Sequence, residues 1–473
     1  MGTCRLAVYR IACAAIWLRS MSKKRTRKFK FPVSALVALS FLIMIIFGTA
    51  MLTMPFATRS GKIDFMNAFF TATSATCVTG LIVQDTLQYW SGFGQAIILI
   101  LIQFGGLGFL TIVSLFTLYS KHVTLSQRKI AMQSAGSVDL AGIKGLLGII
   151  LIGTFSFEFV GAFALSFAFV PVYGWGEGIW QAVFTSVSAF CNAGFTITGV
   201  VSGKSSLMQF VGNPLVVIVV CMLIIIGGIG FFVWGDVIHN GIHIKKYSLH
   251  SKLVLATTGV LIAIGWVLFA IFEWNNPATI GGEGAGTKIL ASLFLSVTPR
   301  TAGFNTVDYA SVTPATSALT IVYMFIGGSP GSTAGGIKTA TIAVFFLSFL
   351  ANAKRYDEIH LYKRRFESEA SQQASSVICI YLFVAILSSI LVCALEVNNP
   401  AVNMENAVFE VISAIGTVGL SKGITDSLCV LSKLALIFLM FFGRVGGFTL
   451  ILIFAGDKKP VAISRVAEKI IIG

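Results

Sequence analysis

The sequence predicts an all-α membrane protein of four covalently linked repeats around a pseudo-fourfold central pore, each repeat being a span, a pore helix and a second span. Three observations predict this fold class: an extreme apolar composition, eight stretches long enough to cross a bilayer, and four similar segments that end in glycine. Of the 473 residues, 56% are hydrophobic and only 11% are charged. A soluble domain of this length could not cover such a surface with polar groups.

The eight apolar stretches each reach the roughly 20 residues that a transmembrane helix needs. They cover residues 33–52, 93–118, 145–170, 214–235, 253–272, 312–350, 376–395 and 434–455. Only Glu158, Lys338 and Arg444 place a charge inside them. We therefore expect eight transmembrane helices.

The net charge is +15, and the basic residues are distributed in step with the order of the spans. Basic residues cluster at 23–30, 121–129, 239–252, 354–365 and 458–469, before the first span, after every even-numbered span and at the chain end. The positive-inside rule places all five clusters in the cytoplasm, with both termini, and the protein in the cell (plasma) membrane. The alternative, a nucleic-acid-binding patch, would need these residues on one folded domain, so we expect membrane lipid and no nucleic acid as a partner.

A shorter segment lies between the two spans of each pair. These segments cover residues 64–81, 178–195, 288–304 and 403–420, and their last glycines are Gly80, Gly194, Gly303 and Gly419. Ten residues before each glycine stands Phe70, Phe184, Leu293 or Phe409, and six before stands Ser74, Ser188, Val297 or Ser413. Four matches at near-equal spacing indicate internal repeats.

The repeats divide the chain into a cytoplasmic extension, 1–30, and four pore repeats, 31–120, 121–238, 239–352 and 353–473, the last with a short C-terminal tail. A segment of about a dozen residues can enter the bilayer as a helix only halfway, and must return as a strand. Such backbone is tolerated where it is buried or lines a watery cavity. Inward helix C-termini favour a cation, and strand carbonyls can replace the hydration shell of potassium. The alternative is packing or turn glycines in another kind of transporter.

The four single-glycine units resemble the Trk/Ktr/HKT superfamily of potassium transporters over residues 31–471, and are most similar to the bacterial Ktr membrane (pore) subunit. The resemblance implies potassium uptake in which sodium can participate, a homodimer, and a cytosolic nucleotide-binding regulatory ring as partner. No covalently bound cofactor is implied; the ion is the substrate. Some sodium-favouring plant members carry serine where this chain has Gly80, so that glycine supports potassium. The filter residues, whose carbonyls would bind the ion, are Cys77, Val78, Thr79, Gly80, Cys191, Asn192, Ala193, Gly194, Arg300, Thr301, Ala302, Gly303, Gly416, Thr417, Val418 and Gly419.

The stretch "GGSPGSTAGGIKT", residues 327–339, interrupts the sixth apolar stretch. It is nearly a phosphate-binding loop, but Ile337 separates Gly336 from Lys338 and apolar spans flank it on both sides, so we disfavour that alternative. A broken helix at membrane depth explains it better, and the resembled family has an intramembrane gating loop in its third unit. The expected gate residues are Gly327, Gly328, Ser329, Pro330, Gly331, Ser332, Thr333, Gly335, Gly336, Lys338 and Arg444.

Each second span also carries a glycine pair or its equivalent: Phe104-Gly105-Gly106, Ile226-Gly227-Gly228, Ile326-Gly327-Gly328 and Phe442-Gly443-Arg444. In the first, second and fourth copies the span runs on as apolar sequence, and close helix packing explains Gly105, Gly106, Gly227 and Gly228. Arg444 replaces a glycine, and we expect it to bond loop carbonyls of residues 327–336. We expect Glu158 to be a buried acid, hydrogen-bonded within the bundle.

Other polar residues give weaker signals. Acidic residues near the starts of the short segments either complement helix dipoles or attract cations: Asp64, Glu177, Glu283 and Glu405. His239 and His243 suit a solvated helix face better than a metal site. No span holds a catalytic cluster, so we expect no enzyme and no catalytic residues. A sodium-permeable relative of the superfamily, and a disfavoured membrane-embedded enzyme, remain as alternatives.

Overall fold

The computed structural model describes residues 33–62, 64–108, 143–198, 206–356, 360–361, 364–365 and 368–447. This part is almost entirely helical. Its only strands are β1 (His360–Leu361) and β2 (Arg364–Arg365), which pair antiparallel in one small hairpin, so the prediction of a helical fold is confirmed for this part. The predicted extension 1–30 and the basic clusters at 121–129 and 458–469 lie outside the described residues.

Each unit begins with a long helix that packs against a shorter pore helix. The long helices are α2 (Val33–Leu52), α8 (Ile143–Tyr173), α12 (Leu249–Glu273) and α16 (Ser368–Leu395). Their pore helices are α3 (Phe65–Thr76), α9 (Trp175–Phe190), α13 (Ala285–Val297) and α17 (Met404–Gly416). Each long helix contacts its own pore helix, and α2 has the predicted bounds.

Capping side chains explain where two pore helices begin. Asp64 accepts hydrogen bonds from the backbone N–H groups of Met66 and Asn67, at 2.9 and 3.2 Å, before α3. Asn403 accepts one from Asn406 at 2.8 Å before α17. Such oxygens satisfy the free N–H groups of a first helical turn. Helix capping is therefore confirmed as a role of Asp64.

Three of the four second helices end earlier than the sequence predicts. The second helices are α5 (Gly92–Leu107), α10 (Pro214–Ile229), the pair α14 (Pro314–Phe325) and α15 (Thr339–Ala353), and α18 (Val430–Val445). Gly108, Gly230 and Gly446 follow α5, α10 and α18 with φ of 78°, 103° and 92°. Glycine adopts this left-handed region without steric cost and so ends a helix. These glycines interrupt the predicted spans 93–118, 214–235 and 434–455, and after Gly230 the helix α11 (Phe231–Asn240) turns by 95° from α10.

Four helices of the described residues are long and apolar enough to cross a membrane: α2, α8, α12 and α16. The bent pair of α10 and α11 makes a fifth if it is taken as one span. The helices α5, α14 and α15 are apolar but shorter. The expectation of eight spans stays a prediction.

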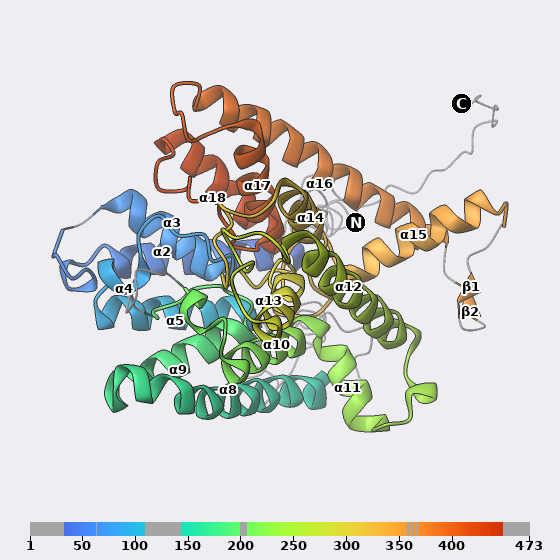
Figure 1. The fold of residues 1–473 in the computed structure, drawn as a ribbon. Coiled ribbons are helices and arrows are strands. Elements are labelled where there is room, and N and C mark those ends of the chain that lie inside the picture. Colours follow the sequence, from blue (N-terminus) through green and yellow to red (C-terminus); the bar gives the residue numbers. More distant parts are fainter. Residues whose placement is uncertain are drawn as a thin grey trace, which may run out of the picture.

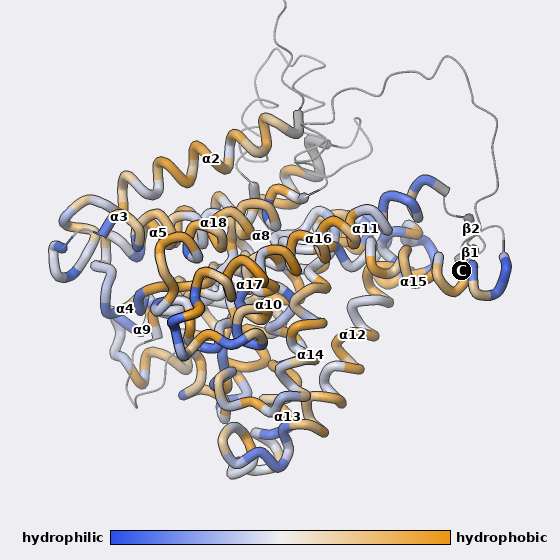
Figure 2. Tube along the Cα trace, turned by 90° about the horizontal axis from the view of Figure 1, so that it is seen from above, coloured by the Kyte–Doolittle hydropathy of each residue, from blue (hydrophilic) through white to orange (hydrophobic). Residues whose placement is uncertain are grey.

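The units are arranged so that each second helix packs against the pore helix of the next unit. These contacts join α5 to α9, α10 to α13, α14 to α17 and α18 to α3. The last unit thereby closes on the first, and Figure 1 shows the units in chain order around the centre. Hydrophobic residues predominate along the helices (Figure 2). The short helices of the connections are η1 (Pro55–Ala57), α4 (Thr86–Tyr89), η2 (Met208–Phe210) and η3 (Ile244–Lys246).

Candidate functional site

The four predicted filter segments, 77–80, 191–194, 300–303 and 416–419, share one backbone conformation. Their second residues have positive φ: Val78 57°, Asn192 59°, Thr301 71° and Thr417 51°. Their terminal glycines also have positive φ: Gly80 89°, Gly194 71°, Gly303 76° and Gly419 91°. Non-glycine residues seldom adopt positive φ, so four equivalent cases are a shared structural feature. The sequence repeat is therefore also a repeat of backbone geometry.

The four glycines approach one another through neighbouring backbones. Each abuts the carbonyl oxygen of the residue before the glycine of the adjacent segment: Gly80 with Ala193, Gly194 with Ala302, Gly303 with Val418 and Gly419 with Thr79. A Cβ at any of the four would lie less than 3.0 Å from that oxygen. We call Gly80, Gly194, Gly303 and Gly419 the glycine ring. It leaves no room for a side chain.

Hydroxyl groups from the pore helices hold the filter segments. Ser74 and Ser413 Oγ accept hydrogen bonds from the N–H groups of Gly80 and Gly419, both at 3.1 Å. In the second unit, Ser188 Oγ donates to the carbonyl of Phe195 at 2.8 Å.

In the third unit, the hydroxyl group that holds the filter segment lies one residue later than the sequence predicts. There Thr298 Oγ1 donates to the Phe304 carbonyl at 2.7 Å, in the role that Ser188 has in the second unit. The predicted equivalent, Val297, carries no hydroxyl. The N–H of Ala302 bonds the Thr298 carbonyl four residues back, where the other units reach five residues back. In the third unit the hydroxyl residue therefore stands five residues before the terminal glycine, where the other units have six.

The carbonyl oxygens of the filter segments are unpaired within the part of the chain that the structure describes. Among the described residues, no carbonyl of these four segments accepts a hydrogen bond. Buried backbone carbonyls are nearly always paired, so a set of free ones needs an explanation. A cavity of about 90 Å³ borders the glycine ring, and Asp85 and Ser421 also line it. The sequence reasoning missed Asp85, whose carboxylate caps α4 by accepting from Leu87 and Gln88 N–H, both at 2.9 Å.

The predicted acids take two different positions. Glu177 and Glu405 lie in the first turns of α9 and α17, and Glu283 precedes α13. Glu405 pairs with Lys422, and the hydrogen bond from that ammonium lowers the pKa of Glu405. The pore helices therefore begin near acids and end at the filter segments.

Arg300 contributes only its backbone to the filter segment. Its side chain is buried, and Nη2 lies 3.4 Å from Thr258 Oγ1 on α12. The sequence could not show this orientation, because a filter residue can direct its side chain either to its own first helix or to the ion path.

The 327–339 loop separates α14 from α15, which confirms the predicted broken helix. It folds back on itself: Gly327 N–H donates to the Ile337 carbonyl at 2.8 Å, and Thr339 N–H to that of Gly328 at 2.9 Å. Lys338 Nζ donates to the Ala334 carbonyl at 2.6 Å. The ammonium group that a phosphate loop would direct at its ligand is thus bonded to the loop itself.

The loop packs directly against the filter. Thr333 Oγ1 donates to the carbonyl of Phe190, the last residue of α9, at 3.1 Å. A Cβ at Gly335 would clash with Thr417 Oγ1, and one at Gly336 would lie 2.9 Å from the Gly416 carbonyl. The loop therefore touches the second pore helix and the fourth filter segment at once.

Arg444 joins the loop to another unit. Its Nη1 donates to the Thr333 carbonyl, as expected, and its Nη2 donates to the carbonyls of Gly105 and, at 3.1 Å, Gly106 on α5. The sequence reasoning missed the α5 partners. The guanidinium also lies over the Phe41 ring, 5.9 Å from its centroid.

The glycine pairs of the first and second units permit close packing, as predicted, and Gly443 of the fourth unit does so too. A Cβ at Gly105, Gly227 or Gly443 would lie less than 3.0 Å from a carbonyl near the end of its own pore helix. In the third unit, Gly327 abuts Gly335 of the loop instead. Glu158 is also as expected: it is buried, and Gln103 Nε2 donates to its Oε2 at 3.2 Å.

Comparisons with known proteins agree on one group. The sequence matches the TrkH family, described as cation transport proteins, over residues 5–460. It is 38% identical over 459 residues to the potassium/sodium uptake protein NtpJ of Enterococcus hirae, covering 96% of this chain and all of that protein. It is 38% identical over 431 residues to the Ktr system potassium uptake protein B of Bacillus subtilis, covering 91% and 94%. The crystal structure of the potassium transporter TrkH from Vibrio parahaemolyticus matches with a TM-score of 0.66 at 20% identity, over 91% of this chain and 85% of that one, which shows a shared fold.

Proposed function

The chain belongs to the TrkH family of cation transport proteins, and on that premise we propose that it is the potassium-translocating membrane subunit of a cation uptake system. The glycine ring carries this proposal. Four carbonyl-bearing segments meet with no side chain between them, and their carbonyls accept no hydrogen bond within the described residues. Rings of carbonyl oxygens can replace the water around a potassium ion.

Selection of the ion takes place in the filter segments. A cation enters from the cavity beside the glycine ring, where the Asp85 carboxylate raises its local concentration. Four pore helices end just before the segments, and the negative ends of their dipoles favour a positive charge there. The ion exchanges its waters for carbonyls from the segments 77–80, 191–194, 300–303 and 416–419.

The 327–339 loop is the gate in this proposal. It is mostly buried, it is hydrogen-bonded to the second pore helix and to Arg444, and it packs against the fourth filter segment. Opening requires the loop to leave these partners. Its glycines allow other backbone conformations, while Pro330 prevents a continuous helix.

The proposal also covers the arrangement of the chain in the membrane and its partners. We propose eight spans with both termini in the cytoplasm, repeats divided at residues 120, 238 and 352, and a homodimer in the cell membrane. A separate cytosolic nucleotide-binding ring would regulate it by docking on the basic connection 354–365. The name of the Bacillus subtilis relative, a protein of the Ktr system, supports such a partner.

Sodium permeation is the second candidate. The Enterococcus hirae relative is named a potassium/sodium uptake protein, and it covers 96% of this chain. The exact preference depends on the distances among the filter carbonyls during conduction.

Ion flux into liposomes that contain only this chain tests the proposal. Potassium uptake that exceeds that of protein-free liposomes, and that prefers potassium over sodium, is the expected result. Equal uptake of both ions would favour the sodium-permeable alternative. Absence of any cation flux, from protein whose fold is verified by circular dichroism and thermal unfolding, and also after removal of the loop, would overturn it.

A further inference from the structure

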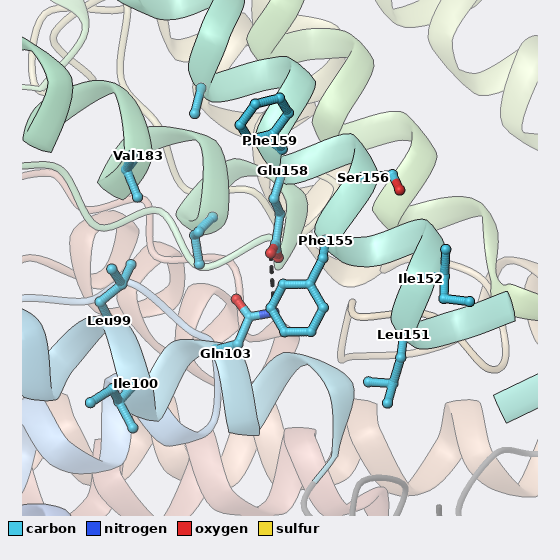
Figure 3. Close-up of a pocket in the computed structure, with 12 residues that line it drawn as sticks. Leu99, Ile100, Gln103, Leu151, Ile152, Phe155, Ser156, Glu158, Phe159 and Val183 are labelled. Carbon is cyan, nitrogen blue, oxygen red and sulfur yellow. Dashed lines mark hydrogen bonds between the residues drawn. The ribbon is translucent and has the colours of Figure 1, made fainter. Parts of the chain in front are cut away.

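A large apolar crevice lies beside the second unit, outside the filter and the loop. Its volume is about 970 Å³, and it lies between α5, α8 and α9. Leu99, Leu151, Phe155, Phe159 and Val183 are among the side chains that line it (Figure 3). Phe159 is 73% exposed, so the crevice opens at the surface.

The floor of the crevice is polar. Glu158 is only 5% exposed, and Figure 3 shows its carboxylate and the Gln103 amide pointing toward one another between α8 and α5. On the other side, Cys191 Sγ lies 3.9 Å from Glu158 Oε1. Within the described residues, no Lys, Arg or His forms an ion pair with this carboxylate. Glu158 therefore has hydrogen bonds but no counter-charge.

The position of this acid makes it unusual. It stands at the middle of the 31-residue α8, which is halfway along a helix long enough to span a bilayer. The corresponding long helices α2, α12 and α16 carry no acid in their middle turns. An ionisable side chain inside a membrane is costly and usually serves a site. Neither the glycine ring nor the loop uses Glu158.

We propose that this crevice binds lipophilic amines, that is, apolar molecules that carry one ammonium group. The apolar walls suit an alkyl or aryl body, and the buried acid at the floor becomes the complementary charge when an ammonium group pairs with it. An ammonium group has three N–H donors, and the Glu158 carboxylate and the Gln103 side-chain carbonyl can accept hydrogen bonds from them. A charge-assisted bond in this water-poor place distinguishes an amine from a plain acyl chain.

Competition binding with one tail and three head groups tests the ligand class. Tritiated dodecylamine is bound to the purified full chain in lipid nanodiscs at neutral pH, without an ion gradient, so the result does not depend on transport. Unlabelled dodecylamine should compete about tenfold better than 1-dodecanol, since only the amine brings the complementary charge, and dodecanoate should compete least. Equal competition by all three would mean that the crevice holds acyl chains only, and would overturn the proposal.

Two variants locate the site. Glu158→Gln keeps the shape and removes the charge, and should weaken dodecylamine binding about tenfold. Ala162→Trp fills the crevice from α8 and should also weaken it, while Glu177→Gln, an exposed acid at the start of α9, should not. Unchanged affinity in both crevice variants would overturn the proposal. If neither variant folds, the competition series on the unmodified chain still decides it.

Discussion

The backbone carbonyl of Thr333 accepts a hydrogen bond from Nη1 of Arg444, 111 positions later in the chain. The same guanidinium bonds the carbonyls of Gly105 and Gly106 on α5. One side chain of the fourth unit thereby connects the loop of the third unit with the second helix of the first. Any movement of the loop away from the filter has to break this connection.

Arg444→Gln should increase potassium flux. The shorter, neutral side chain loses bonds to carbonyls, each charge-assisted bond being worth about 1.5–3 kcal/mol. Losing one would shift a closed-to-open equilibrium about tenfold or more. Flux into proteoliposomes measures this, with Lys433→Gln at the start of the same helix as the control. A folded Arg444→Gln protein with lower flux would contradict the gating role.

Shortening the 327–339 loop should also raise flux, because the barrier is removed while the filter segments stay in place. Lys338→Ala should have a smaller effect, since its ammonium group, among the described residues, bonds the carbonyls of Ala334 and Gly335, both within the loop. A phosphate-binding loop predicts the reverse, with both changes abolishing activity. Comparing the two proteins by flux at equal reconstitution separates these readings.

Gly303→Ala should reduce potassium uptake and its preference over sodium. The residue has φ of 76°, and the new Cβ would lie less than 3.0 Å from the Val418 carbonyl. Gly423→Ala is the matched control: its φ is 83°, yet a Cβ there meets nothing within 4 Å. Both carry about 1–2 kcal/mol of left-handed backbone strain. Similar sodium competition in the two proteins would remove the filter assignment.

The Glu405–Lys422 pair should stabilise the protein less as the medium is acidified. The folded pKa of Glu405 is depressed, chiefly by the Lys422 hydrogen bond. Its stabilisation is therefore present above the unfolded pKa, about 4.3, and is lost as pH falls through the folded pKa. Lys422→Met should lower the unfolding temperature near neutral pH and less so at about pH 3. A temperature difference that does not change with pH would assign the effect to packing against Phe409 instead.

Accessibility of two exposed positions tests the orientation. A cysteine at Ser60 should react with an impermeant thiol reagent added to intact cells, whereas one at Lys354 should react only after the membrane is opened. The expectation follows from the alternation of basic connections along the chain. Labelling of Lys354→Cys in intact cells would reverse the topology.

The sequence predicted the elements that an unbroken apolar run or a repeated segment marks. α2 begins and ends where its apolar run does, and the pore helices recur in four copies. It did not predict the ends of α5, α10 and α18, because a glycine such as Gly230 in an apolar run suits packing and helix termination equally well. Only the positive φ at Gly230 shows that the helix ends there.

Long-range contacts of the site were predicted only in part. A charge in an apolar run predicts a polar partner, which identified the loop as a partner of Arg444. The sequence could not identify α5 as the other partner of Arg444. Which helix lies on the far side of α18 depends on the order of the units around the centre, and the sequence does not show that order. The one-residue shift at Thr298 was missed for a similar reason: spacing counts residues and does not show how the last helical turn ends.

The contact of α18 with α3 bears on how the protein is made. Synthesis runs from the N-terminus, so the first filter segment is inserted long before its neighbour on one side exists. The Gly419 segment, which abuts Thr79, comes from the fourth unit, near the end of the described chain. A premature stop codon before α17 would therefore leave three complete units and an open circle of filter segments, with no neighbour for Thr79 on that side.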